Sequence, residues 1–416
     1  MNQKKTAFRN TFIVLFFVFF AIAMLGGLFW ANLRYVQGSP TSLEFLPIWK
    51  GANNLLVEGL TPYGEFTTYE IQKMAYGRAA GPGEPPLRVS LPLPLLLLFL
   101  PLGAFADMEL ARAAWMLILE ISLVLLLIFS VRLAQSQLKW FELLFLFLFG
   151  FLCFFSVQAL RSASPALLLA MLLFGSLLAQ QASFEELAGM LLAFSFFSLE
   201  MGGLLLLFLL VWAALNRRWR IWAGLLMTLS ILGAIAFIIN PDWAISFLMS
   251  ALVNGRANLD PSTFSLFSGW FPGLGQRIAW GLAFLVLLLL MVESQQAFRR
   301  SSLQGFWLAS LVAAVTPLVG LPVKAGGLVF LLPAFLLSAV VLVQRWPASG
   351  RWVALALLSL ILGLSWLFDA YRVESSFLWM SLLAVFTLYW VRWWVVRPSR
   401  LWADRVSPRR DGHVSY

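Results

Sequence analysis

The chain has 416 residues, of which 61% are hydrophobic and 12% are charged, and its formal net charge is +10. Soluble globular domains carry roughly 45–50% apolar and about 25% charged residues, so this composition excludes a water-soluble fold and indicates a membrane protein. With one cysteine, Cys153, and one histidine, His413, the chain cannot form an intramolecular disulfide. The same scarcity argues against a Cys/His zinc site and against a Cys–His or Ser–His catalytic pair. Chemistry therefore falls to carboxylates, hydroxyls, Lys, Arg, backbone groups or an oxygen-ligated metal.

About twelve segments are apolar enough to cross a membrane, because a helix needs roughly 20 apolar residues to span the hydrocarbon layer. They cover residues 11–31, 91–106, 108–133, 140–159, 164–182, 187–214, 220–240, 276–293, 303–320, 325–345, 351–369 and 376–395. Segment 91–106 is short and rich in proline, so we expect it to be kinked or only partly inserted. Segment 187–214 is long enough for one tilted helix or for two half-helices that meet near Glu200. The sequence thus predicts an all-α polytopic protein: one multi-pass domain over 1–395 and a basic tail over 396–416.

Lysine and arginine collect at alternate ends of these segments. With twelve spans, the basic N-terminus, three basic turns and the tail all fall on one side, which the positive-inside rule assigns to the cytoplasm. Arg132 and Lys139 fall on the other side, and Arg161, between two spans, falls on the cytoplasmic side. We therefore predict a multi-pass protein of the cell membrane with both termini cytoplasmic. The positive charge orients the chain and gives no reason to expect a nucleic-acid partner.

Two long loops, 32–90 and 241–275, are placed on the outer side by this topology. Within the first, 48–58 and 67–76 have helical spacing, and each is followed by a glycine that suits a helix C-cap. We expect amphipathic helices here, lying along the membrane surface.

Several ionisable residues stand out by position. Glu120 and Glu200 lie near the middle of spans, where a charge is costly. They are expected to pair, to be protonated, to face a water-filled cavity, or to be satisfied by helix neighbours. Lys324 stands alone in an apolar turn, which suits either a lipid phosphate or simple snorkelling. Glu44 follows the first span by about a dozen residues and precedes Phe45, Ile48 and Trp49, a context that would hold it at the membrane surface.

Familiar nucleotide and metal motifs are missing from the sequence. It contains no G-x-x-x-x-G-K-[ST] motif, no dinucleotide fingerprint and no D-x-D. An ATP-driven pump and a metal–diphosphate site therefore have no support, and we predict no protein-bound metal site, leaving a requirement for a divalent ion open.

Three stretches carry a family resemblance: EFLPIWKGANNLLVEGLTPY (44–63), LPLPLLLLFLPLGAF (91–105) and ELARAAW (109–115). Together they resemble the opening of glycosyltransferase family 87, whose pattern is roughly D-F-x-x-[YW]-x-x-A-x-x-x-L-x-x-G-x-x-P-Y, followed by Y-P-P before an apolar run ending in P-L. LLPAFLL (331–337) is similar to the closing segment of that family. The chain departs from the pattern where Glu44 replaces Asp and Leu91 replaces Tyr. SASP (162–165) and LEM (199–201) also stand in place of two polar family motifs.

The resemblance implies a GT-C-type membrane enzyme that transfers a mannose-like hexose, with inversion, from a polyprenyl phosphate donor to a lipid-linked or cell-envelope glycan at the outer face. The donor lipid and the acceptor are then substrates, membrane lipids are partners, and no cofactor is expected. Glu44 matches the acidic residue that acts as general base in such enzymes. The substrate-binding candidates are the three cations Lys324, Arg88 and Arg256, for the leaving phosphate, together with Trp49, Tyr63 and Glu200.

Two other functions stay open from the sequence. One is a transporter or lipid flippase that uses Glu120 and Glu200 as a relay, although such proteins commonly show inverted repeats and we find none. The other is a catalytically inactive assembly partner of another membrane enzyme.

Overall fold

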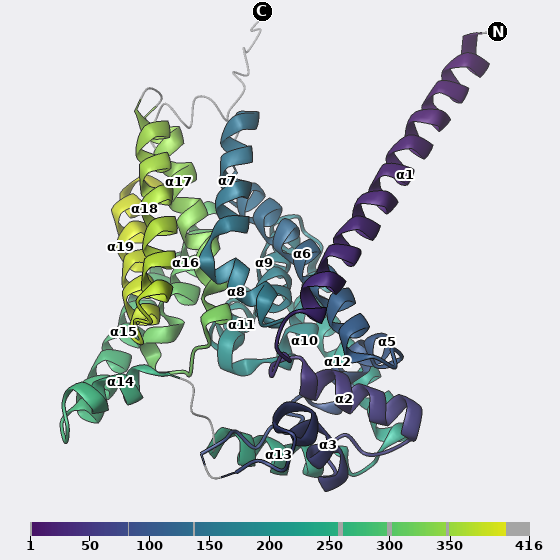
Figure 1. Ribbon diagram of the computed structural model, residues 1–416. Coiled ribbons are helices and arrows are strands. Elements are labelled where there is room, and N and C mark those ends of the chain that lie inside the picture. The colour runs from purple at the N-terminus through teal and green to yellow at the C-terminus, as the bar shows by residue number, and fades with distance from the viewer. Residues whose placement is uncertain are drawn as a thin grey trace, which may run out of the picture. The chain divides into compact units, whose positions relative to one another are not determined.

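The computed structural model describes residues 2–81, 83–135, 138–256, 261–297, 302–346 and 349–396 (Figure 1). This part of the chain is all-helical, with 80% helix and no strand. Apart from Val396, the predicted basic tail lies outside the described residues. The chain divides into two compact units, which we describe separately. The first unit is Met1–Ser122, Leu160–Pro165 and Leu232–Ala257, and the second is Leu123–Ala159, Ala166–Ile231 and Asn258–Tyr416.

Seven helical stretches of the described chain are long and apolar enough to cross a membrane. They lie in α1 (Asn2–Gln37), α6 (Met108–Leu133), α12 (Trp219–Ile239), α15 (Gly275–Ala297), η5 (Ala325–Leu331) with α17 (Leu332–Arg345), α18 (Gly350–Ala370) and α19 (Ser376–Val396). A pair of helices bent by 50°, α7 (Trp140–Leu152) and α8 (Phe154–Arg161), makes an eighth if it forms one span. These helices support a multi-pass membrane protein, while the GT-C fold stays a prediction. Twelve alternating spans would place the starts of 140–159 and 351–369 on opposite sides of the membrane, but Glu142 and Arg351 at these starts lie 3.7 Å apart, so the structure does not keep the predicted alternation.

Besides the 140–159 segment, which forms α7 and α8, two more of the predicted spans are interrupted in the structure. Residues 91–106 form three short pieces, α4 (Leu93–Leu96), η2 (Leu97–Phe99) and α5 (Leu100–Gly103). Both α4 and α5 carry proline in their first turn, where the missing N–H costs no hydrogen bond. The segment is therefore kinked, as expected.

The span predicted over 187–214 consists of two helices, not one. These are α10 (Glu185–Phe194) and α11 (Leu199–Leu215), joined by the 3₁₀ turn η3 (Ser195–Phe197). Ser198 is extended, with φ −145° and ψ 89°, which ends the helical hydrogen-bond ladder just before Glu200. Of the two alternatives for this segment, the structure shows two half-helices.

In the second unit, α16 (Ser302–Val315) packs against α17 and α19, and α18 packs against α17 (Figure 1). The remaining helices of this unit are α9 (Ala166–Gln181), η4 (Thr316–Val319) and α14 (Thr263–Trp270). A Cβ atom built on Gly189 of α10 would lie 2.0 Å from the carbonyl oxygen of Ile221 in α12, and one on Gly224 would lie 2.4 Å from that of Glu186. The backbones of α10 and α12 approach this closely because both positions are glycine.

In the first unit, the predicted loop helices are present. Helix α2 (Leu46–Asn53) continues as one π-helical turn, η1 (Asn54–Glu58), and α3 spans Glu65–Tyr76. Gly59 and Gly77 end them in the left-handed conformation, with φ of 65° and 76°, which confirms both C-caps. Helix α13 (Trp243–Arg256) also belongs to this unit, and Ser250 on it donates a hydrogen bond to the Val89 carbonyl at 2.7 Å.

Candidate functional site

Glu44 lies in the turn that opens α2, and its side chain is half-buried. Ser42 caps this turn: its Oγ accepts a hydrogen bond from the Phe45 N–H at 3.3 Å, and its carbonyl accepts one from Leu46 N–H at 3.0 Å. A serine that caps the first turn in this way fixes the direction in which the helix starts. The backbone on both sides of Glu44 is therefore held, while its carboxylate is not enclosed.

The loop at residues 161–163 supports this turn through three successive backbone carbonyls. The carbonyl of Ser162 accepts a hydrogen bond from Ser42 Oγ, that of Arg161 accepts one from Arg112 at 2.7 Å, and that of Ala163 accepts one from the Trp115 indole N–H at 2.9 Å. Ala163 has a positive φ of 52°, an uncommon conformation for a residue with a side chain. The SASP segment (162–165) thus lies directly against the Glu44 turn.

Phe45 adds an aromatic contact to the same support. Its ring stacks on that of Trp115 with centroids 5.8 Å apart and an interplanar angle of 7°. Trp115 also contacts Phe99, at 5.2 Å between centroids. Phe45 and Trp115 are 0% and 2% exposed, so the residue next to Glu44 anchors the turn in the core of the first unit.

Arg112, near the start of α6, is 4% exposed. It donates to the Pro40 carbonyl at 2.7 Å and to Ser39 Oγ at 3.2 Å, besides the Arg161 carbonyl. Within the described part of the chain it forms no ion pair: neutral oxygens accept all the hydrogen bonds of its two terminal nitrogens, and its Nε is buried without a partner. Through these hydrogen bonds Arg112 links the segment before Glu44 to the 161–163 loop, and it places a positive charge next to both.

Helix α2 is also fixed from its other side, against α5. Asn53 Nδ2 donates to the Gly103 carbonyl at 2.8 Å, and the Trp49 indole N–H donates to the Phe105 carbonyl at 3.3 Å. Tyr63, after η1, donates its hydroxyl to the Leu91 carbonyl at 2.7 Å, and burial raises the pKa of this phenol. Trp49 and Tyr63, two predicted substrate-binding residues, thus direct their polar hydrogens to the backbone.

A polar network connects α2 to α3. Lys50 Nζ lies 3.2 Å from Glu70 and 3.7 Å from Glu58, and Asn54 Nδ2 donates to Glu70 at 2.8 Å and to Thr67 Oγ1 at 3.1 Å. Lys50 and Asn54 are 9% and 0% exposed. With every charge paired, this network stabilises the two helices of the loop.

The predicted phosphate-binding cations of the first unit differ in what the structure shows of them. Arg88 forms an ion pair with Glu65, with 3.0 Å between Nη1 and Oε1, so part of its charge is already neutralised. Arg256 is the last residue of α13, and its side chain lies outside the described part of the chain.

In the second unit, Glu200 is exposed at the start of α11. Its neighbours are residues of 313–331, with which it lines a hollow of about 310 Å³; Thr316 and Pro322 belong to this lining. Lys324 is half-buried at the N-terminus of η5, and the loop before it is tied down by a hydrogen bond from Val323 N–H to the Pro261 carbonyl at 2.9 Å. Glu200 and Lys324 belong to the second unit, whereas Glu44 belongs to the first.

Glu120, the other intramembrane carboxylate, belongs to the first unit. Its carboxyl lies beside the side-chain amide of Asn32 on α1, and its Oε2 is buried without a hydrogen-bond partner. Asn32 itself is 7% exposed. Glu120 thus lies beside a neighbouring helix with one carboxyl oxygen unpaired among the described residues, so none of the expectations for it is confirmed.

The sequence did not single out Arg112 or Ser42. Arg112 is one of two charged residues in ELARAAW, and nothing local shows that it is buried. Ser42 carried no capping signal either, because Phe45 stands three positions later where a capping box has Glu or Gln. Comparison with protein-family models, with curated proteins and with solved structures gave no match for this chain.

Proposed function

We propose that this protein is an integral-membrane glycosyltransferase that moves a mannose-like hexose from a polyprenyl phosphate donor to a lipid-linked or cell-envelope glycan at the outer face. The observation that carries the proposal is the placement of Glu44. Glu44 is half-buried in a turn whose backbone is held by Ser42, Phe45 and the 161–163 loop. Such preorganisation is what a general base requires, because a misplacement of about 1 Å can cost a factor of about 100 in rate.

The proposed chemistry is a single displacement. The carboxylate of Glu44 takes the proton of the acceptor hydroxyl, the hydroxyl oxygen bonds to the anomeric carbon, and the bond from that carbon to the phosphate oxygen breaks. The lipid phosphate leaves with the electron pair, and the configuration inverts. Lys324, Arg88 and Arg256 are assigned to the leaving phosphate on charge alone, and of these Arg88 already shares its charge with Glu65.

The test is Glu44→Gln, which keeps the size of the side chain but removes its basicity. Protein reconstituted in liposomes with polyprenyl phosphate mannose and a panel of glycan acceptors should lose transfer by roughly 100- to 10,000-fold. Glu109→Gln is the matched control, because Glu109 is an exposed carboxylate in the first turn of α6. Transfer by Glu44→Gln at the rate of the unmodified protein would overturn the proposal.

A second candidate function is supported by the broken helix of the second unit. Interrupted helices at ion-coupling sites are typical of secondary transporters, and here the break at 195–198 precedes Glu200, which lines a hollow. If the protein transports a solute or flips a lipid, Glu200→Gln and Glu120→Gln should abolish movement across proteoliposomes, while Glu44→Gln leaves it intact. The opposite pattern of losses supports the transferase.

A further inference from the structure

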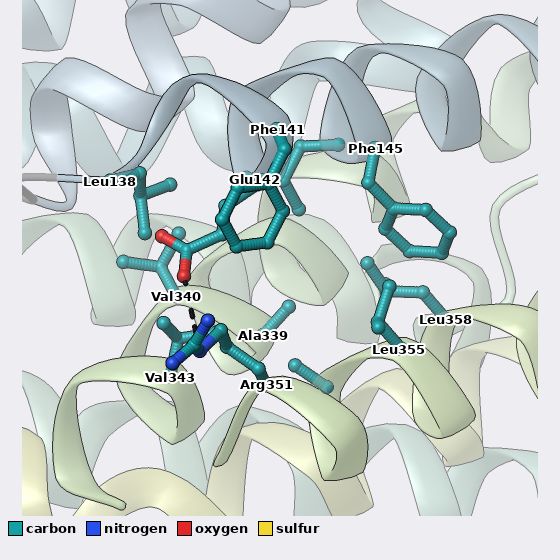
Figure 2. A pocket seen from close by; sticks show the side chains of 12 residues that line it. Leu138, Phe141, Glu142, Phe145, Ala339, Val340, Val343, Arg351, Leu355 and Leu358 are labelled. Atoms are coloured by element: carbon teal, nitrogen blue, oxygen red, sulfur yellow. Dashed lines mark ion pairs between the residues drawn. The ribbon is translucent and has the colours of Figure 1, made fainter. Parts of the chain in front are cut away.

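A groove lies on the second unit between α7, α17 and α18 (Figure 2). It holds about 370 Å³ of empty space, and of its twelve lining residues all but Glu142 and Arg351 are apolar. Small side chains from α17 and α18, such as Ala339, Val340 and Ala354, keep it open. From Arg351 to Leu358 the groove follows α18 for about 10 Å, at 1.5 Å per residue. Its apolar lining suits a hydrocarbon chain rather than a polar ligand.

The two charged residues of the groove lie together, as Figure 2 shows. Arg351 Nε is 3.7 Å from Glu142 Oε1, and its guanidinium lies 5.7 Å from the centroid of the Phe141 ring. Glu142 also accepts a hydrogen bond from the Lys139 backbone N–H at 2.8 Å, so its charge is shared between two donors. The terminal nitrogens of Arg351 take part in no hydrogen bond among the described residues. They remain available to an acceptor outside the protein.

Neighbouring tryptophans indicate the depth of this charged end in the membrane. Trp140 is the first residue of α7 and Trp352 the third of α18, and their exposed fractions are 74% and 73%. Exposed tryptophan at helix ends is typical of the headgroup level, where its ring is partly in hydrocarbon and its N–H meets water. Arg351 is therefore placed at the level of lipid phosphates, and the apolar part of the groove extends toward the hydrocarbon.

The charge at this end favours an anionic lipid. Lys139, which is exposed, and Arg351 carry two positive charges, and Glu142 carries one negative charge, so the net charge is +1. We propose that the groove binds one anionic glycerophospholipid, with its phosphate on the terminal nitrogens of Arg351 and part of one acyl chain along α18. Guanidinium forms paired hydrogen bonds with phosphate, and its stacking on Phe141 fixes the plane in which it presents them.

The experiment is a native mass-spectrometry titration of the full-length protein, delipidated in neutral detergent, with dioleoyl phosphatidic acid. Arg351→Gln should weaken binding roughly 10- to 100-fold, the range expected for losing hydrogen bonds to a charged group. Arg220→Gln is the matched control: Arg220 is likewise the second residue of a 21-residue helix, adjoins the exposed Trp219 and pairs with Glu186 at 3.8 Å, but does not line the groove.

Two further measurements separate the contribution of the lipid phosphate to binding from that of the acyl chain. Dioleoylglycerol, with the same chains and no phosphate, should bind at least tenfold more weakly than phosphatidic acid, and inorganic phosphate should not compete. Ala354→Phe, which fills the groove and keeps Arg351, should also weaken binding, with thermal unfolding as the check on folding. Equal binding by Arg351→Gln and Arg220→Gln would overturn the proposal. Competition by inorganic phosphate, or unchanged binding by a folded Ala354→Phe, would also overturn it, because either would reveal an anion site independent of the groove.

Discussion

Gly103 decides how closely α2, the helix that follows Glu44, packs on α5. A Cβ atom at this position would lie 2.7 Å from the Ala52 carbonyl carbon and 2.8 Å from the Asn53 backbone nitrogen. Carbon atoms normally approach to about 3.5 Å, so Gly103→Ala must separate the two backbones by about 0.8 Å. Both contacts are with backbone, which cannot rotate away as a side chain would. We expect a loss of about 1–3 kcal/mol in the free energy of unfolding, the usual range for overpacking.

The same separation would stretch the 2.8 Å hydrogen bond between Asn53 and the Gly103 carbonyl. Thermal unfolding in detergent, followed by intrinsic tryptophan fluorescence, measures the effect. Gly26→Ala is the control, because Gly26 is also helical but has nothing within 4 Å of the place that a Cβ atom would take. There the substitution should be neutral or stabilise by up to about 1 kcal/mol, through helix propensity. If Gly103→Ala were as stable as Gly26→Ala, the tight packing of α2 on α5 would be refuted.

Two further predictions concern charged residues of the first unit. Arg112→Gln should destabilise the protein by about 1–3 kcal/mol, because it removes the hydrogen bonds that the buried guanidinium donates to the Pro40 and Arg161 carbonyls. Arg161→Gln, at an exposed residue, should change stability by less than about 0.5 kcal/mol, and equal melting temperatures of the two variants would contradict the prediction. Hydrogen bonds from Arg78 and from the Gly81 N–H lower the pKa of Glu84 below its usual 4.5. Their stabilising contribution is therefore present above pH 4.5 and is lost as the pH falls through the folded-state pKa. An NMR titration of ¹³C-labelled Glu84 should show this lowered pKa rising in Arg78→Gln, and an unchanged titration would contradict the assignment.

The length of the apolar segments predicts most of the long helices. Segments 108–133, 220–240, 351–369 and 376–395 correspond to α6, α12, α18 and α19 within one residue at every end. The C-caps at Gly59 and Gly77 were also predictable, because the left-handed conformation that ends a helix depends on the local sequence.

Contacts between distant segments could not be predicted in the same way. Ser42 and the 162 carbonyl are 120 positions apart, and only tertiary structure brings them together. Gly189 resembles other glycines of the apolar segments, yet it is the one that meets the Ile221 carbonyl, whereas Gly26 meets nothing. Arg112 reads as an ordinary charge at the start of a helix, and its burial depends on a loop from elsewhere in the chain. The contacts around Glu44 likewise depend on tertiary structure and could not be predicted from the sequence.

Glu44 and the 161–163 loop lie far apart in the sequence, although they lie close together in the fold. This has a consequence for the protein during its synthesis. Chains are extended at about 5–20 residues per second, so roughly 6–24 s pass between the emergence of Ser42 and that of its partner at position 162. Over that interval the turn lacks the carbonyls that later hold it, and Arg112 lacks one of its acceptors. The start of α2 is thus exposed to membrane proteases and insertion factors before its support arrives, and variants that weaken the 161–163 loop should reduce the yield of the protein more than its stability once folded.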